Sequence, residues 1–382
     1  MAQRKRVGLV FSYNENWMGG TYYFVNLVKA LHTVSERLKP IITVIGSSHE
    51  GFTFLKNETK YPYLELYKQK SKLTLLQRAL NKLCKLFRLP KIFKTKVITR
   101  QLDMIYKYYA DPSPRICPTV FWIPDFQEKF LPEFFSGDEI QLRQDYYENI
   151  ANNENHVAFS SNVSKGHFMG LFPTSKIDTH ILQFAVSNPN IEDANIDDIL
   201  VKYGLPGRFY FTPNQFWKHK NHTVVLEAVR ELKAQGVDVV IAFSGKENDY
   251  RNKEYIQELK DFVSNNDLLD NIRFLGFLPR LDQLAIMKAS IAIVQPSLFE
   301  GWSTVVEDAK ALNKFMILSN LEVHKEQVDN NCDFFDPRDP ESLSVLLGNY
   351  SKSNPVTIEN DYSQSVLAYG ESLISLIEKV TQ

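Results

Sequence analysis

Short apolar runs alternate along this chain with longer segments of helical periodicity. Runs rich in β-branched and aromatic residues predict ten strands, at 7–12, 41–47, 120–123, 157–161 and 179–184 in the first half and at 209–212, 237–244, 272–275, 291–295 and 315–318 in the second. Apolar residues recur between them at three- and four-residue intervals, which is typical of amphipathic helices. Strands that alternate with helices form parallel sheets with helices on both faces. The pattern therefore predicts an α/β fold.

A polar stretch at 187–198, which contains Pro189 and several Asn and Asp residues, separates the two sets of strands. A chain of 382 residues also exceeds what one hydrophobic core usually serves. We therefore expect an N-terminal domain at 1–186 and a C-terminal domain at 187–361. A last helix, about 362–382, follows a turn-rich patch at 351–361 and need not belong to the second sheet. This helix can instead pack back on the first domain.

The composition is that of a soluble globular protein, with 44% hydrophobic and 23% charged residues. The apolar run Val7–Phe11 is too short for a signal-peptide core or a membrane span, so a cytoplasmic location is expected. Cys84, Cys117 and Cys332 are far apart and odd in number, which predicts neither a disulfide framework nor a C-x-x-C metal site. No D-x-D pair and no cluster with metal-ligand spacing occurs, so no metal or other cofactor is expected.

Charge is segregated along the chain. Residues 67–102 contain eleven Lys and Arg and no Asp or Glu, which leaves about −12 on the rest of a chain whose net charge is −1. Leucines recur there at helical spacing, with basic residues opposite, which predicts a basic amphipathic helix at about 72–88. Such a helix suits docking on an anionic membrane surface, at the inner face of the cell membrane. The alternative is a helix packed on its own domain with a solvated basic face. Nucleic acid is disfavoured because no recognised binding motif accompanies the charge.

The segment PSLFEGWSTVVEDAKAL at 296–312 has the pattern of a strand end, a glycine turn and a helix start. Ligands of open parallel sheets bind beyond the carboxyl ends of the strands, where a helix N-terminus offers N–H groups to phosphate. Gly301 lets the backbone approach closely, while the carboxylates of Glu300 and Glu307 suit sugar and ribose hydroxyls. The plainer alternative is a capping box of Thr304 and Glu307 beside a solvated Glu300.

F-E-G followed by a second Glu seven residues after the first resembles the E-x7-E motif of glycosyltransferase family 4. PNQFWKHKNH at 213–222 resembles the donor-site loop of polysaccharide-assembly members of that family. The resemblance implies the GT-B fold, in which two Rossmann-like domains face each other across a cleft and the C-terminal one binds a nucleotide-sugar. It also implies that Lys220 neutralises the diphosphate, that Glu300 holds sugar hydroxyls and that Glu307 holds the ribose.

Further donor contacts are expected near these residues, and base-reading contacts from the backbone at 276–279. The donor-binding residues expected besides Lys220, Glu300 and Glu307 are Gly19, Gly20, Asn214, Gly276, Leu278, Gly301, Trp302, Ser303 and Thr304. Many relatives carry an Arg five or six residues before the Lys, where this chain has Asn214 and Gln215, so its phosphate clamp is less cationic. As an alternative, 218–220 is a merely solvated basic loop.

The first half offers weaker signals. Gly19 and Gly20 follow the first strand and resemble the loop that faces the donor phosphates, although a simple strand-to-helix turn is the alternative. Asp125 follows a strand and is the catalytic acid candidate at the cleft, or else it caps the next segment. His324 is more simply structural.

We therefore expect a retaining glycosyltransferase of polysaccharide biosynthesis. It would be a hexosyltransferase, and a mannosyltransferase is one such enzyme. It would move a hexose from a GDP- or UDP-sugar to a hydroxyl of a glycan or lipid-diphosphate-linked acceptor. A GT-B sugar-nucleotide epimerase and a non-catalytic sugar-nucleotide-binding protein are the alternatives.

Overall fold

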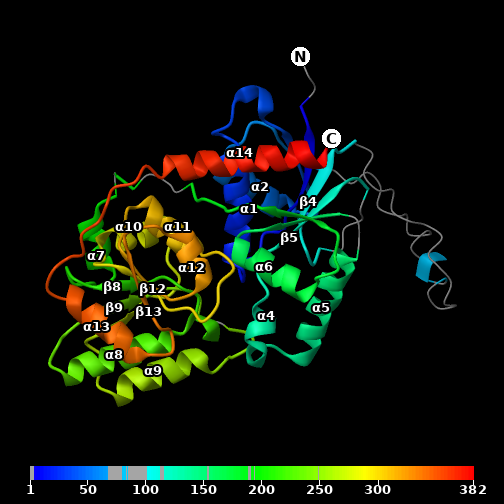
Figure 1. The fold of residues 1–382 in the computed structure, drawn as a ribbon. Coiled ribbons are helices and arrows are strands. Elements are labelled where there is room, and N and C mark those ends of the chain that lie inside the picture. The colour runs from blue at the N-terminus through cyan, green and yellow to red at the C-terminus, as the bar shows by residue number, and fades with distance from the viewer. Residues whose placement is uncertain are drawn as a thin grey trace. The chain divides into compact units, whose positions relative to one another are not determined.

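The computed structural model describes residues 4–67, 80–82, 84, 101–111, 116–152, 155–187, 191–192, 194–247 and 249–382. These residues form two sheets, one of seven strands in the order β3-β2-β1-β4-β5-β6-β7 and one of six in the order β10-β9-β8-β11-β12-β13 (Figure 1). Counted from its own first strand, the second sheet has the 3-2-1-4-5-6 order of the Rossmann fold, and the first has the same order with a seventh strand added at its edge. The predicted α/β class with two Rossmann-like sheets is therefore confirmed.

The first sheet contains all five strands predicted in the first half of the chain and two further ones. Its strands are β1 (Arg6–Val10), β2 (Ile41–Ile45), β3 (Leu64–Leu66), β4 (Met104–Tyr108), β5 (Thr119–Ile123), β6 (His156–Phe159) and β7 (Asp178–Ile181). The helices of this part of the chain are α1 (Met18–Ala30), α2 (His49–Thr59), α4 (Gln127–Phe130), α5 (Gly137–Ala151) and α6 (Asn162–Leu171), with short 3-10 turns η1 (Glu36–Leu38) and η2 (Pro132–Phe134).

The second sheet is made of six short strands. They are β8 (Tyr210–Thr212), β9 (Ile241–Phe243), β10 (Ile272–Phe274), β11 (Ile293–Gln295), β12 (Met316–Ser319) and β13 (Cys332–Phe335). The helices are α7 (Ile196–Lys202), α8 (His222–Ala234), α9 (Tyr255–Asn265), α10 (Arg280–Ala289), α11 (Thr304–Ala311), α12 (Glu322–Gln327), α13 (Pro340–Tyr350) and α14 (Ser363–Val380), and η3 (Lys218–Lys220) is a 3-10 turn.

Both faces of the second sheet are buried because successive side chains point to opposite faces. Tyr210 packs in the apolar cluster under α8, α9 and α13, whereas Phe211 packs in the cluster on the other face, with residues of α10 and α11. Helices accordingly lie on both sides of this sheet in Figure 1. Strands that are buried on both faces consist of consecutive apolar residues, which explains why most of these strands could be predicted from the sequence.

Three strands were not predicted, namely β3, β4 and β13. Lys107 interrupts β4, yet it is only 3% exposed because its Nζ donates to the Asp111 carbonyl at 2.9 Å and lies over the Phe121 ring. The edge strands β3 and β13 carry acidic residues and are incompletely buried. Their polarity hid them from a search for apolar runs.

Contacts group the chain into two compact units. The first comprises Met1–Trp122, Glu154–Val157 and Gly370–Gln382, and the second comprises Ile123–Asn153 and Ala158–Tyr369. The boundary expected near residue 187 stays a prediction, as does the division 1–186 and 187–361. The expected last helix is confirmed as α14, whose Gly370 lies against Ala30 of α1 in the first unit.

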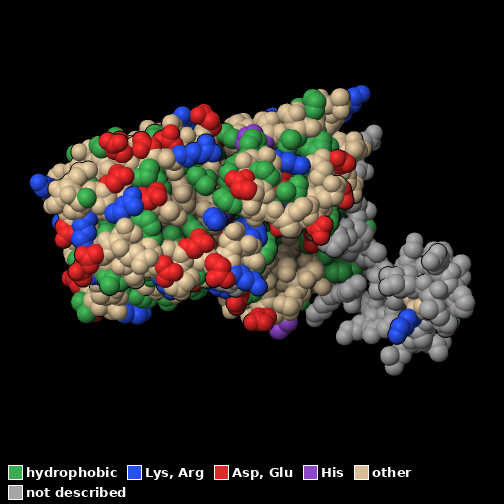
Figure 2. Space-filling view, turned by 90° about the horizontal axis from the view of Figure 1, so that it is seen from below, with side chains coloured by type: hydrophobic (Ala, Val, Ile, Leu, Met, Phe, Trp, Pro, Cys, Tyr) green, Lys and Arg blue, Asp and Glu red, His purple; other side chains and the backbone are tan. Residues whose placement is uncertain are grey.

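The predicted basic helix at about 72–88 lies almost entirely outside the described residues. Elsewhere, acidic and basic side chains are interspersed on the face shown in Figure 2. Within the described part of the chain, no helix combines the length and the apolar character that a membrane span requires.

Candidate functional site

The central strands of the second sheet, β8 and β11, are neighbours, but the chain continues from them toward opposite edges. Such a switch point in strand order is where α/β proteins bind ligands, beyond the carboxyl ends of the strands. The lysine loop, 213–221, follows β8, and the glutamate loop, 296–303, follows β11. The topology therefore brings the two predicted motifs to one place.

Backbone contacts fix the two loops against each other. The Leu298 amide donates to the His219 carbonyl at 2.8 Å. Asn221 has φ 55°, a left-handed conformation that Asn tolerates, and its side-chain amide donates to the carbonyls of Pro296 at 3.2 Å and Pro337 at 2.7 Å. The spacing between the loops is thus set by groups other than the site residues.

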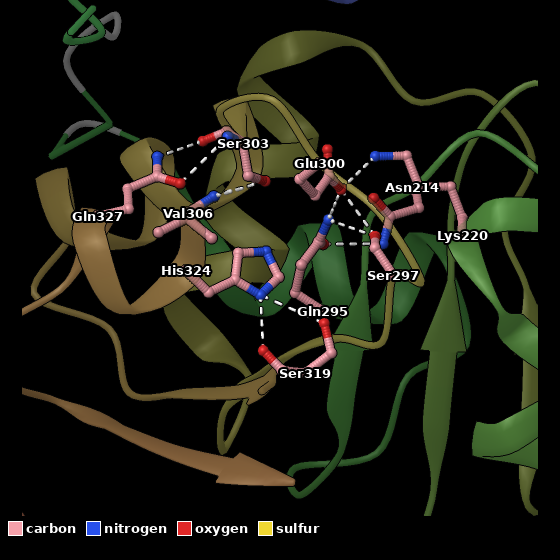
Figure 3. Close-up of polar contacts among 10 residues, drawn as sticks. All are labelled: Asn214, Lys220, Gln295, Ser297, Glu300, Ser303, Val306, Ser319, His324 and Gln327. Atoms are coloured by element: carbon pink, nitrogen blue, oxygen red, sulfur yellow. Dashed lines mark hydrogen bonds and ion pairs between the residues drawn. The ribbon is translucent and has the colours of Figure 1, made fainter. Parts of the chain in front are cut away.

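Lys220 and Glu300 form an ion pair at the centre of this junction (Figure 3). The Lys220 Nζ lies 2.5 Å from Glu300 Oε1, and the same oxygen accepts hydrogen bonds from Ser297 Oγ at 2.7 Å and Gln295 Nε2 at 2.8 Å. Asn214 Nδ2 in turn donates to Gln295 Oε1 at 2.9 Å and so orients that amide. Lys220, Glu300 and Asn214, which were predicted separately, belong to one network.

This network favours the ionised carboxylate. Burial alone would raise the pKa of Glu300, but the Lys220 ammonium, His324 and the hydrogen bonds from Lys220 and Ser297 hold that pKa below its ordinary value. The Lys220 and Glu300 side chains keep 17% and 10% of their surface exposed. An ammonium has three N–H donors, and among the described residues only Glu300 accepts one from Lys220 and none donates to Glu300 Oε2. A ligand can thus meet both a cation and a carboxylate oxygen.

Asp125 lies beside this pair. A Cβ on Gly301 would be 2.0 Å from the Pro124 carbonyl oxygen and 2.9 Å from Asp125 Cβ, so only glycine allows the glutamate loop to pass there. Burial raises the pKa of Asp125, and Glu300 adds to this, while Arg143, the Gln127 amide and Lys220 oppose it. The structure therefore brings Asp125 together with Lys220 and Glu300. Asp125 Oδ1 also accepts a hydrogen bond from the Gln127 amide at 3.1 Å, although the N-cap residue of α4 is Phe126.

Glu307 lies in the first turn of α11 and is only 1% exposed. Its Oε1 accepts from Gln327 Nε2 at 2.8 Å and Lys310 Nζ at 3.0 Å, and its Oε2 accepts from the Tyr362 hydroxyl at 2.5 Å. Both oxygens are thus covered by protein groups. The alternative capping box does not form, because the N-cap of α11 is Ser303.

The residues between the two glutamates are also engaged. The Ser303 amide donates to Gln327 Oε1 at 3.1 Å, and Ser303 Oγ accepts from the Val306 amide at 3.4 Å. Trp302 donates through Nε1 to the Phe184 carbonyl at 3.0 Å. Thr304 begins α11 and is half-buried. Trp302 and Ser303 thus hold the glutamate loop in place through hydrogen bonds to other segments of the protein.

On the other side of the lysine loop, Gly276 has φ 68° with open space where a side chain would be. Leu278 is 6% exposed and packs in the core, which leaves only its backbone for a ligand. Phe277 between them is 57% exposed, and the Lys246 ammonium lies 5.6 Å from the centre of its ring.

Gly19 and Gly20 belong to the first unit. Gly19 is exposed at the start of α1. Gly20 is buried because the Trp17 indole lies against it, and a Cβ there would be 2.4 Å from that ring. Gly20 is thus required for packing, which agrees with the turn reading, whereas Gly19 keeps an open surface.

His324 is wholly buried next to the ion pair (Figure 3). Its Nδ1 lies 2.9 Å from the Ser319 carbonyl oxygen, which can only accept, so Nδ1 carries the proton. Burial lowers the pKa of His324, although Glu300 opposes this. The bond from Nδ1 to the Ser319 carbonyl holds the ring at the end of β12, as a structural residue would.

Several members of the site gave no sequence signal. Gln295, Ser297, Gln327 and Tyr362 are common polar residues whose partners are distant in the sequence or lie in irregular loops. Only the fold places them. In the part of the chain that the structure describes, no three His, Cys, Asp or Glu side chains gather as metal ligands would.

Comparisons with known proteins bear on this geometry. Residues 200–356 match the family model of glycosyl transferases group 1, a range that includes both Lys220 and Glu300. No curated protein matches the sequence. The fold is similar to that of Anabaena HepE in complex with UDP and glucose, with a TM-score of 0.64 and 14% identity over 98% of this chain and 95% of that one.

Two further solved structures agree. WaaG, a glycosyltransferase involved in lipopolysaccharide biosynthesis, gives a TM-score of 0.62 at 12% identity, over 98% of each chain. A glycosyltransferase from Rickettsia africae gives 0.60 at 16% identity, over 99% of this chain and 97% of that one. The chain has the GT-B fold. Its place in family 4 stays a prediction.

Proposed function

We propose that this protein is a retaining glycosyltransferase that moves a hexose from a nucleoside-diphosphate sugar to a hydroxyl of a glycan or lipid-linked acceptor. The observation that carries the proposal is the Lys220–Glu300 pair, which stands at the switch point of the second sheet inside the region that matches glycosyl transferases group 1. HepE binds UDP and glucose, which supports a nucleotide-sugar donor. WaaG acts in lipopolysaccharide biosynthesis, which supports a role in polysaccharide assembly. UDP- and GDP-sugars, including GDP-mannose, are all compatible with the site.

Lys220 has the role that the leaving group requires. Negative charge grows on the diphosphate as the glycosidic bond breaks, and a fixed ammonium there stabilises the transition state more than the ground state. Because Lys220 stays tethered to Glu300 by one N–H, its remaining donors are held in place for phosphate oxygens. The clamp uses protein cations and backbone amides, so no metal is part of the proposal.

Glu300 and Asp125 have roles at the sugar. Glu300 is held ionised, and its Oε2 is the oxygen that accepts a hydrogen bond from a sugar hydroxyl. In the front-face displacement that we propose for retention, the departing phosphate oxygen takes the acceptor proton, so no strong general base is needed. Asp125 then positions the acceptor or the reacting sugar by hydrogen bonding.

Glu307 is the proposed ribose ligand, but Tyr362 must move away before a ribose can bind there. Tyr362 occupies Oε2, and the carboxylate is almost wholly covered. The ribose can reach Glu307 only where the phenol gives way. The Tyr362 hydroxyl therefore stands where a ribose hydroxyl would.

Release of nucleoside diphosphate from UDP-glucose, UDP-galactose and GDP-mannose, with and without acceptor glycosides, tests the proposal. Glu300→Gln keeps the size of the side chain but removes its charge, and we expect turnover to fall roughly 10²- to 10³-fold. Glu322→Gln, which changes an exposed carboxylate on α12, is the matched control and should retain full activity.

Other outcomes separate the alternatives. Donor epimerised without any acceptor would identify an epimerase. Binding of nucleotide with no release of diphosphate from any donor would identify a non-catalytic sensor. Full turnover in Glu300→Gln would contradict the assignment of the site.

A further inference from the structure

Three aromatic side chains form a cluster next to the glutamate loop, and we call Phe130, His167 and Phe299 the aromatic ledge. The Phe130 ring stacks on Phe299, with centroids 5.3 Å apart and planes inclined by 23°. The His167 ring lies 4.2 Å from that of Phe130 and 6.0 Å from that of Phe299. All three belong to the second unit, as do Lys220 and Glu300.

The ledge is attached directly to the site. Phe299 immediately precedes Glu300, and the Leu298 amide bond to His219 fixes the backbone before it. Phe130 ends α4, which starts two residues after Asp125. Asp125 and His167 are also close enough for the carboxylate to raise the pKa of the imidazole against the lowering by burial. The ledge and Asp125 therefore border the same surface as the ion pair.

The position of Phe130 is held by a buried neighbour. Phe126 has no exposed surface and packs on Tyr147, Phe159 and Phe168. Since Phe126 fills the core at the start of α4, Phe130 at its end remains 48% exposed. An aromatic surface fixed by a buried anchor beside charged groups is typical of a ligand site.

We propose that the aromatic ledge binds a pyranose ring of the acceptor, with Asp125 accepting a hydrogen bond from one of its hydroxyls. This deepens the proposed function and rests on it. A pyranose has an apolar face of C–H groups and a rim of hydroxyls, and the ledge offers the exposed part of the Phe130 ring next to a carboxylate. Continuity with Glu300 places such a ring beside the donor sugar, where its hydroxyl can reach the reacting carbon.

A lipid chain or a protein partner fits less well. The ledge consists of three rings and is bordered by Asp125 and by the Lys220–Glu300 pair, so an alkyl chain would lie against charged groups. Burial of those charges without partners would oppose such binding.

Saturation-transfer NMR on the full-length protein tests the ledge without requiring turnover. The probes are the methyl and octyl glycosides of glucopyranose, mannopyranose and galactopyranose, with UDP or GDP present. Irradiation of aromatic protons should transfer saturation to the ring C–H protons of at least one methyl glycoside. Phe130→Ala should abolish this transfer, and Phe334→Ala, which removes a 37% exposed Phe from β13, should leave it unchanged.

The kinetic counterpart uses the glycoside that binds. Loss of one aromatic stacking contact is worth about 0.5–1.5 kcal/mol, so Phe130→Ala should raise the acceptor KM roughly twofold to twelvefold, while the Kd of the nucleotide stays the same. Transfer that is absent for every methyl glycoside in the wild type, or that persists in Phe130→Ala, would overturn the proposal. Transfer to the octyl chains alone would assign the ledge to lipid and overturn it as well. The proposed function fails on a different result, the absence of diphosphate release from every donor.

Discussion

Lys220 is held against Glu300 by contacts between their two loops and by further hydrogen bonds to the Glu300 carboxylate. The Asn221 side chain and the Leu298 amide tie the two loops together, and Ser297 and Gln295 complete the shell around Glu300 Oε1. An active group held by such a shell loses little mobility when the ligand arrives. The charge pair is therefore in place before any donor binds.

Replacement of Lys220 by Met removes the ammonium and keeps most of the side-chain volume. We expect kcat to fall roughly 10²- to 10³-fold, because the growing charge on the leaving diphosphate loses its cation. Steady-state release of nucleoside diphosphate measures this. Lys218→Met is the control and should keep near-normal rates. Lys218 also lies in η3, but among the described residues Glu300 forms its ion pair with Lys220. Equal losses in both variants would mean that the loop acts only by its general charge.

Tyr362→Phe tests whether Glu307 is the ribose ligand. The change removes the hydroxyl that bonds Glu307 Oε2 and leaves the ring, and a hydrogen bond to a charged group is worth about 1.5–3 kcal/mol. The variant should be less stable without ligand, yet bind nucleoside diphosphate roughly 10- to 10²-fold more tightly, because a ribose hydroxyl no longer competes with the phenol. Denaturant unfolding and calorimetric titration measure the two effects. Weaker nucleotide binding would assign Glu307 a purely structural role.

At the scale of single residues, sequence reasoning found the groups that carry charge but missed those that hold them. Lys220, Glu300 and Asp125 stand out in short motifs after strands, and the fold brings them together. Gln327 and Tyr362 have no such motif. Their partner Glu307 is twenty or more positions away, so only the tertiary structure reveals the contact.

Among the elements, α8 begins with a buried titratable group. His222 is its first residue, has no exposed surface and stacks on Phe216, with centroids 4.6 Å apart and planes inclined by 19°. Burial, aided by Lys220, lowers the pKa of His222 to about 3. The folded state thus keeps this ring neutral at pH values where the unfolded chain, with a pKa near 6.5, takes up a proton.

The pH dependence of stability follows from that difference. Between pH ~6.5 and about 3, the unfolded state binds a proton at His222 that the folded state does not bind. This difference should lower the free energy of unfolding by about 1.4 kcal/mol for each pH unit of acidification within that range. His222→Phe keeps a flat ring against Phe216 and removes the titration. Between pH 6.5 and 5.5 (chosen assay values), its stability should fall less than that of the wild type by roughly 1 kcal/mol.

Urea unfolding at the two pH values measures this effect. His49→Gln, at an exposed position in α2, is the control and should leave the pH dependence as in the wild type. A His222→Phe variant with the wild-type acid sensitivity would show that other groups cause it.

The elements themselves were predicted where burial is complete. β8, β10, β11 and β12 are fully or mostly apolar and were found in the sequence, whereas β4 was hidden by Lys107 and β13 by its acidic residue. β9 was predicted four residues too long at its start, because the valines at 237, 239 and 240 indicate a strand although they precede the ladder. The pattern of apolar residues predicts which strands are buried, and the prediction fails where a polar residue is buried together with a hydrogen-bonding partner.

For the whole molecule, the alternation of strands and helices predicted parallel sheets, and the GT-B fold implied by the sequence motifs is confirmed. The order of the strands was not predicted, because it depends on which strands pair in three dimensions. The domain boundary stays a prediction. The expected basic helix at 72–88 lies outside the described residues, so its role also stays a prediction.

Vesicle flotation tests the predicted membrane surface. Residues 67–102 carry eleven basic residues without an acid, and each is worth about 1 kcal/mol near an anionic leaflet. The protein should float with phosphatidylglycerol vesicles at low salt, much less at high salt, and not with phosphatidylcholine vesicles. No flotation with the anionic vesicles at low salt would rule out this mode of attachment.

The central claim is that the Lys220–Glu300 junction holds the diphosphate of a nucleotide-sugar, and thermal unfolding with UDP and GDP tests it most directly. A ligand at a hundred times its Kd stabilises the folded state by about 2.7 kcal/mol. We predict that one of the two nucleotides raises the Tm of the wild type and of Lys218→Met, and that it leaves the Tm of Lys220→Met unchanged. No shift with either nucleotide, or the same shift in Lys220→Met, would contradict the account.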